Sequence, residues 1–186
     1  MIKRKKFLII KSLSIKVLII LTIKNSIGYY IRPAAIKDVA KMRHLISSYA
    51  AKNLMLPRDD GYLHKLLANY SVAIGDGKFA GTCGFQLWQP DWLEIVSLAV
   101  KPEFQHQGMG TALIQSIINK GVALGFNYFF TITLVPELFE KSGFKKIKFK
   151  KIAFKVKADC RFCPKNDAGP GRGSCNEIPL ELTVKS

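Results

Sequence analysis

The stretch that decides the fold reads Leu98-Ala99-Val100-Lys101-Pro102-Glu103-Phe104-Gln105-His106-Gln107-Gly108-Met109-Gly110-Thr111. A strand ends, a loop with two spaced glycines follows, and a helix begins. Backbone N–H groups at a helix N-terminus have no helical partner and attract anions. Gly108 and Gly110 lack a Cβ, so the main chain can approach a phosphate closely, and Thr111 adds a hydroxyl. Glycines alone are also typical of a tight turn, so the surrounding residues decide between the two interpretations.

Outward from this loop, hydrophobic periodicity predicts one mixed α/β domain of the α+β type. We expect strands at 29–31, 71–74, 79–88, 93–100, 126–134, 146–156 and 178–184. Helices are expected from near Pro33 to Tyr49, at 62–68, from the glycine loop to near Gly125, and at 136–142. Gly75-Asp76-Gly77 predicts a hairpin turn.

The composition fits a folded chain, with 186 residues of which 48% are hydrophobic. A net charge of +16 favours nucleic acid, an anionic surface or an anionic ligand as partner. Seven basic residues and no acid lie within residues 1–28, which leaves +9 on residues 29–186. The longest uncharged stretch of this leader, 17–23, is too short to span a bilayer. We predict that residues 1–28 are disordered or serve in targeting, and that residues 29–186 form the domain.

The quoted stretch resembles the GNAT superfamily of acetyltransferases, whose strand ends Leu-Ala-Val, followed by x-Pro and [Arg/Gln]-x-x-Gly-x-[Gly/Ala]. The resemblance extends to the segment Phe139-Glu140-Lys141-Ser142-Gly143-Phe144. It implies a GNAT fold, a central mixed sheet that splays to admit acetyl-CoA. The backbone of Leu98, Ala99 and Val100 would bind the pantetheine arm, and an N–H near Leu98 would polarise the thioester carbonyl. The pyrophosphate would be held by residues of the loop, namely Gln105, His106, Gln107, Gly108, Met109, Gly110 and Thr111.

The same resemblance implies that Glu94, upstream on the strand, takes a proton from the amine directly or through water. A solvated strand carboxylate is the plain alternative. His44, His64 and His106 are weaker candidates for the base. Many family members have a tyrosine in the late helix where this chain has Phe139. A thiol with a pKa near ~8.5 can leave without an acid, so this departure does not exclude catalysis.

Three features resemble the short, single-domain N-acetylglutamate synthases of arginine biosynthesis. They are Met55-Leu56-Pro57-Arg58, the strand Glu94-Ile95-x-Ser97-Leu98-Ala99-Val100, and a tail with Asp159-Cys160-x-x-Cys163-Pro164-Lys165 and Cys175-Asn176-Glu177-Ile178. The resemblance implies L-glutamate as acceptor, with Arg58 and Ser97 in its binding site, and leaves a homodimer open. Arg58 could hold a carboxylate in a bidentate fork, or it could be a surface arginine. Many members of this group have arginine where this chain has Val96, and its replacement could change the substrate or give the carboxylate-binding role to another basic residue.

Cys160, Cys163 and Cys175 are one thiol short of an all-cysteine zinc site, and we predict structural thiols in a 157–178 loop rather than a metal. Four cysteines in a chain of this length indicate a reducing compartment, so we expect a cytoplasmic protein, with organellar targeting by residues 1–28 left open.

Two alternatives stand beside the glutamate hypothesis. One is acetylation of another amine, such as a protein N-terminus or a small metabolite. The other is a non-catalytic nucleic-acid-binding module using basic and aromatic residues of 149–155.

Overall fold

The computed structural model describes residues 23–24, 28–88, 91–163 and 175–185. Within these residues, eight strands form one mixed sheet in the order β1-β2-β3-β4-β5-β6-β8-β7. Neighbouring strands are antiparallel except β5 and β6, which are parallel. The strands are β1 (Ile23–Lys24), β2 (Tyr29–Pro33), β3 (Ser71–Gly75), β4 (Lys78–Trp88), β5 (Trp92–Val100), β6 (Tyr128–Thr133), β7 (Lys145–Lys146) and β8 (Ile178–Thr183).

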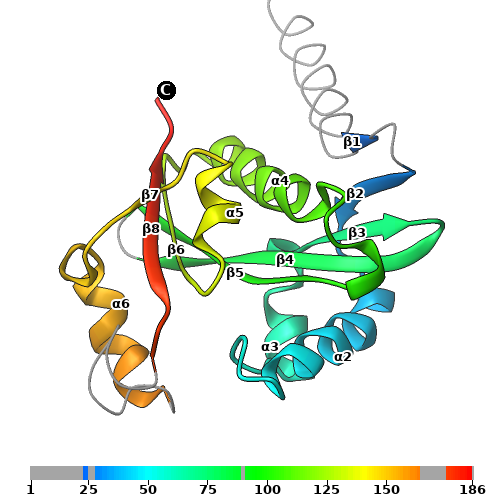
Figure 1. Cartoon of the computed structure of the whole chain (residues 1–186), viewed down its shortest axis with the longest axis horizontal. Helices are drawn as coiled ribbons and strands as arrows, with labels where there is room; N and C mark the ends of the chain where they lie inside the picture. The colour runs from blue at the N-terminus through cyan, green and yellow to red at the C-terminus, as the bar shows by residue number, and fades with distance from the viewer. Residues whose placement is uncertain (1–22, 25–27, 89–90, 164–174, 186) are drawn as a thin grey trace, which may run out of the picture.

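Helices cover both faces of this sheet, which confirms the predicted mixed α/β class (Figure 1). They are α2 (Val39–Ala50), α3 (Asp60–Lys65), α4 (Met109–Ala123), α5 (Pro136–Glu140) and α6 (Ala153–Ala158). The longest, α4, lies on the opposite face from α2 and α3 (Figure 1). No helix among the described residues is both long enough and apolar enough to cross a membrane.

Each face of the sheet has its own hydrophobic core. The core under α4 joins Leu113, Ile114 and Ile117 to inward-facing residues of the central strands. The core under α2 and α3 joins apolar residues of both helices to Tyr70 and its neighbours on the strands. Burial of these apolar side chains is the main favourable contribution to folding. The two cores fix the sheet from both sides and so hold β5 at its centre.

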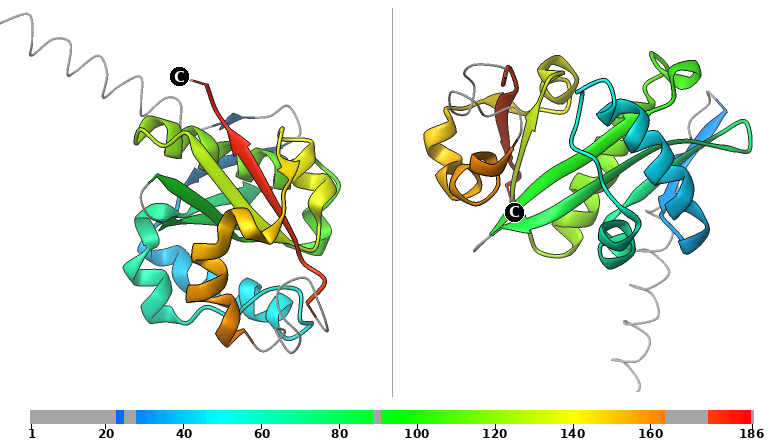
Figure 2. Two further views of the ribbon diagram at one scale, coloured as in Figure 1. Left: turned by 90° about the vertical axis from the view of Figure 1, so that its left-hand side faces the viewer. Right: turned by 90° about the horizontal axis from the view of Figure 1, so that it is seen from below.

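The centre of the sheet opens where β5 and β6 separate. Their parallel pairing ends at Glu94 and Phe130, so β5 continues to Val100 without β6 beside it. Figure 2 shows the two strands diverging from the end at which they pair. A β-bulge lies in the separated part of β5, where Cys83 of β4 faces both Ser97 and Leu98. The predicted splayed sheet is thereby confirmed.

Most predicted elements are present, and the hairpin turn at 75–77 has positive φ at Asp76 and Gly77, as such a turn requires. The strand predicted at 146–156 is wrong. Only β7 is extended there. A 3-10 helix (Phe149–Ile152) and then α6 follow it. Alternating lysines imitated a strand, but the buried positions Ile152 and Lys155 are three residues apart, which suits a helix.

Two helices also differ from their predicted bounds. The segment after β2 is a 3-10 turn (Ile36–Asp38) before α2, because Pro33 still pairs within β2. The second helix begins earlier than predicted, at Asp60, because the Asp59 carboxylate accepts a hydrogen bond from the Tyr62 N–H at 2.7 Å. It ends at Lys65, and a separate 3-10 turn (Leu67–Asn69) follows. Most of the predicted leader, residues 1–22 and 25–27, lies outside the described residues.

Candidate functional site

A cavity of about 230 Å³ lies between the separated parts of β5 and β6. Its walls come from the 94–98 part of β5, the 131–135 end of β6, the segment 54–58 after α2, and the C-terminal part of the chain around α6. Of the predicted site residues, it brings together Glu94, Ser97, Leu98 and Arg58. We call it the β5–β6 cavity. Four predicted residues from two motifs, the 94–100 strand and the 55–58 segment, thus line one chamber.

Glu94 is the buried carboxylate of this cavity, with only 5% of the residue exposed. Its Oε2 accepts a hydrogen bond from Trp88 Nε1 at 2.8 Å and lies 2.9 Å from Lys155 Nζ. Burial raises the pKa of Glu94 above its usual range, although the charge and hydrogen bond of Lys155 oppose the shift. Because Glu94 is buried, the solvated-carboxylate interpretation is wrong. A carboxylate with a raised pKa is a stronger base than an exposed one.

Lys155 is the ionic partner that the sequence analysis did not identify. Its Nζ also lies 2.7 Å from Asp159 Oδ2 and 4.8 Å from the centre of the Trp88 ring. Burial alone would lower the pKa of Lys155, but Glu94 and Asp159 together raise it, so the ammonium stays charged. We had assigned Lys155 to a strand. The signal that could have located it is the four-residue spacing to Asp159, which only a helix converts into contact.

Arg58 lines the cavity from the segment 54–58, which precedes α3. Its guanidinium carbon is 4.5 Å from the centre of the Tyr62 ring, and its Nε is buried without a hydrogen-bond partner. A buried donor of this kind is costly unless a ligand accepts from it. Arg58 is half-buried and lines the cavity, and its role in holding a carboxylate stays a prediction.

Ser97 and Val96 occupy the bulged part of β5. Ser97 has φ +55°, and its Oγ accepts a hydrogen bond from the Tyr70 hydroxyl at 3.1 Å. Val96 is buried and contributes an apolar wall to the cavity. Phe139 of α5 is buried in the same chamber and packs edge-on against Phe144. The position expected for a tyrosine therefore presents only an apolar ring.

The 105–111 loop is built as a turn into the N-terminus of α4. Gly108 is the N-cap with φ +80°, and His106 also has positive φ, at +60°. The first helical hydrogen bond runs from the Ala112 N–H to the Gly108 carbonyl, so the N–H groups of residues 109–111 precede the helical ladder. No side chain caps this end of α4. His106, Gln107 and Gly108 are exposed, so the geometry suits an anion arriving from solvent.

Gln105 holds the loop to β5 and α2. Its Nε2 donates to the Tyr49 hydroxyl at 2.6 Å and to the Val100 carbonyl at 3.1 Å. The Tyr49 hydroxyl in turn donates to the same Val100 carbonyl at 2.5 Å, and Tyr49 also lines the β5–β6 cavity. The side chain of Gln105 is thus used inside the protein, and its main-chain N–H also donates to the Pro102 carbonyl at 3.2 Å. Tyr49 connects the two candidate binding regions.

Strand β5 offers its backbone along the open edge. On the side of β4, Ala99 pairs with Thr82 and Val100 with Gly81. On the other side, pairing with β6 ends at Glu94. The polar backbone groups of the later residues on that edge can therefore pair with an extended ligand as a further strand would. Leu98, which lines the cavity, lies where this edge meets the chamber.

The three histidine candidates lie outside the cavity. His44 and His64 are exposed on α2 and α3, and His106 lies on the exposed 105–111 loop, so none of the three lines the cavity. Cys160, Cys163 and Cys175 are free thiols, and burial raises the pKa of Cys160 to about 11. Within the described residues, no three His, Cys, Asp or Glu side chains are grouped so as to hold a metal ion.

Comparison with known proteins places this geometry among acetyltransferases. The sequence profile of the Acetyltransferase (GNAT) family matches residues 39–144. An uncharacterized N-acetyltransferase of Chlorobaculum tepidum is 29% identical over 83% of this chain and 96% of its own length. An amino-acid acetyltransferase of Neisseria meningitidis is 30% identical over 62% of this chain. This chain spans only 27% of that relative.

Solved structures with the same fold include the N-acetylglutamate synthase of Neisseria gonorrhoeae, complexed with coenzyme A and N-acetyl-glutamate. It superposes with a TM-score of 0.74 and 24% identity over 88% of this chain and 36% of its own length. A Mycobacterium tuberculosis protein solved with CoA superposes with a TM-score of 0.70 and 22% identity over 83% of this chain and 99% of its own. At these identities the superpositions establish the shared fold.

Proposed function

Because the chain belongs to the Acetyltransferase (GNAT) family, we propose that it transfers the acetyl group of acetyl-CoA to the amine of an amino acid, with L-glutamate as the acceptor. The observation that carries the proposal is the β5–β6 cavity, which holds a buried carboxylate of raised pKa and a half-buried arginine with an unsatisfied donor. A base and a carboxylate-binding group in one chamber are what acetylation of an amino acid needs.

The 105–111 loop and the open edge of β5 supply the binding surface for acetyl-CoA. N–H groups of the first turn of α4 would bind the pyrophosphate, and Gly108 leaves room for its close approach. The backbone of residues 98–100 would pair with the pantetheine arm, and the N–H near Leu98 would stabilise negative charge on the thioester oxygen. Acetyl-CoA supplies the activated acetyl group.

Glu94 would prepare the acceptor by removing a proton, because a protonated amine has no lone pair for attack. Trp88 and Lys155 both contact Oε2, so Oε1 is the oxygen we assign to the transfer. Lys155 keeps its proton, which prevents it from competing as the base. Phe139 offers no acid to the leaving thiolate, so we propose that CoA leaves unprotonated.

Arg58 would bind one carboxylate of the acceptor, with Ser97 beside it. The amino-acid acetyltransferases among the relatives support an amino-acid substrate, and the solved complex of the gonococcal synthase with N-acetyl-glutamate supports glutamate. Both relatives are much longer than this chain, so a place in arginine biosynthesis, a cytoplasmic location and a homodimer remain part of the proposal.

The test is a thiol-release assay with purified full-length protein, acetyl-CoA and a panel of amino acids, polyamines and peptide N-termini. We expect CoA release with L-glutamate, a loss of turnover in Glu94→Gln, and mainly a higher KM for L-glutamate in Arg58→Ala. Arg43→Ala, which removes an exposed arginine paired with Asp60 on the surface, is the matched control. Turnover with another amine and none with L-glutamate would overturn the choice of acceptor. No turnover with any amine would overturn the enzymatic assignment.

A further inference from the structure

The β5–β6 cavity contains a second cation besides Arg58. We propose that Lys155 binds the other carboxylate of a dicarboxylic amino acid, and that Asp159 occupies this place until the substrate arrives. The inference deepens the proposed function and rests on it for the amino-acid acceptor.

Cations and carboxylates both line the cavity. Arg58 and Lys155 are its two basic residues within the described chain, and Glu94, Asp159 and Glu177 are its three acidic ones. A dicarboxylic amino acid carries two carboxylates and one amine, and thus needs two cations and one base in the same chamber. Arg58, Lys155 and Glu94 supply this set.

The two carboxylates already on Lys155 are not equivalent. Glu94 is buried on a central strand, with its side chain 6% exposed, and is fixed further by Trp88. The side chain of Asp159 is 46% exposed and follows the last turn of α6. Asp159 can therefore turn into solvent without breaking the core, whereas Glu94 cannot. Only one of the two ion pairs is exchangeable.

Exchange at Lys155 also keeps the local charge constant. If a substrate carboxylate replaces that of Asp159, the ammonium still has two carboxylates around it. Binding without displacement would gather three carboxylates on one ammonium, which is unfavourable in a buried site. The Lys155–Asp159 pair has a buried ammonium but a carboxylate that is 46% exposed, so water can solvate Asp159 once a substrate replaces it. Loss of this pair therefore opposes substrate binding less than loss of a fully buried pair would. Asp159 thus acts as an internal substitute for the substrate carboxylate.

Isothermal titration calorimetry of the full chain in the presence of CoA tests the proposal without turnover. The ligands are L-glutamate and L-glutamine, which differ in the second carboxylate. We expect Lys155→Met to weaken L-glutamate binding about tenfold or more, the loss expected for a charge-assisted hydrogen bond, and to change L-glutamine binding little. Asp159→Asn should tighten L-glutamate binding about two- to fivefold by removing the competitor.

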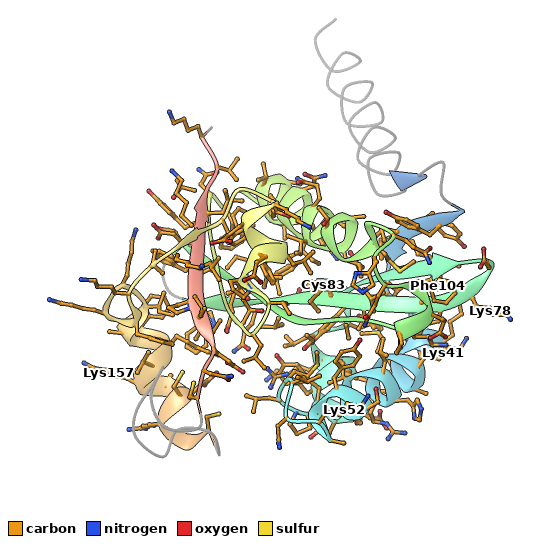
Figure 3. The ribbon with its side chains drawn as sticks, viewed as in Figure 1. Lys41, Lys52, Lys78, Cys83, Phe104 and Lys157 are labelled. Atoms are coloured by element: carbon orange, nitrogen blue, oxygen red, sulfur yellow. The ribbon has the colours of Figure 1, made fainter. Side chains whose placement is uncertain are left out.

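Lys157→Met is the matched control, because Lys157 lies on the same helix and points away from the body of the protein (Figure 3). The proposal is overturned if Lys155→Met weakens both ligands equally, if Asp159→Asn does not tighten L-glutamate binding, or if the unmodified protein does not prefer L-glutamate. Should Lys155→Met fail to fold, the result with Asp159→Asn decides alone. L-glutamate binding in the predicted pattern without CoA release would instead refute the proposed reaction.

Discussion

Replacing Tyr49 with phenylalanine removes the hydroxyl that joins α2 to β5 and to the 105–111 loop. The hydroxyl makes two hydrogen bonds, to Val100 O at 2.5 Å and from Gln105 Nε2 at 2.6 Å. Each such bond contributes about 0.5–1.5 kcal/mol. Gln105 Nε2 also donates to Val100 O, so neither partner is left unsatisfied. We therefore expect the variant to lose about 1–2 kcal/mol of unfolding free energy.

Part of that energy holds the loop in the conformation that we propose binds pyrophosphate. If most of the lost hydrogen-bond energy had served to position the loop, the KM for acetyl-CoA should rise about three- to tenfold, since about 1.4 kcal/mol corresponds to a factor of ten. The KM for the amine should stay within about twofold. Urea unfolding and steady-state thiol release measure the two effects, and Tyr128→Phe, at an exposed residue, is the control. A less stable Tyr49→Phe variant with an unchanged KM for acetyl-CoA would refute a role of Tyr49 in positioning the loop.

Three further substitutions test the base, the loop and the core. In Glu94→Gln, kcat/KM should fall about 10²- to 10⁴-fold. The unmodified enzyme should also lose activity as the pH drops through the raised pKa of Glu94, and this acid limb should vanish in Glu94→Gln but persist in Glu137→Gln. Gly108→Ala forces a Cβ onto a residue with φ +80°, so we expect about 1–2 kcal/mol of destabilisation and a higher KM for acetyl-CoA, measured by thermal unfolding and thiol release. Gly121→Ala would place a Cβ 2.5 Å from Phe129 Cε1, which should lower the unfolding free energy by about 1–3 kcal/mol in urea while kcat per folded molecule stays constant.

Local sequence was sufficient wherever one segment defines its own geometry. The glycines of the 105–111 loop, the turn at 75–77 and the apolar runs of the central strands each follow from their own residues. The C-terminal part was harder, because α6 has only six residues and its lysines imitate the alternation of a strand. A helix this short has little intrinsic stability and forms through tertiary packing, which a local pattern does not contain.

Sequence patterns therefore determined the family resemblance and the order of most strands and helices, and they supplied the residues that we propose for phosphate binding and proton transfer. The tertiary structure alone decided which of them meet. Glu94 and Lys155 are far apart in the chain, and their contact exists because β5 and α6 border the same opening in the sheet. Burial at that contact raises the pKa of Glu94. Desolvation depends on everything that surrounds a group, so no motif around Glu94 could specify it.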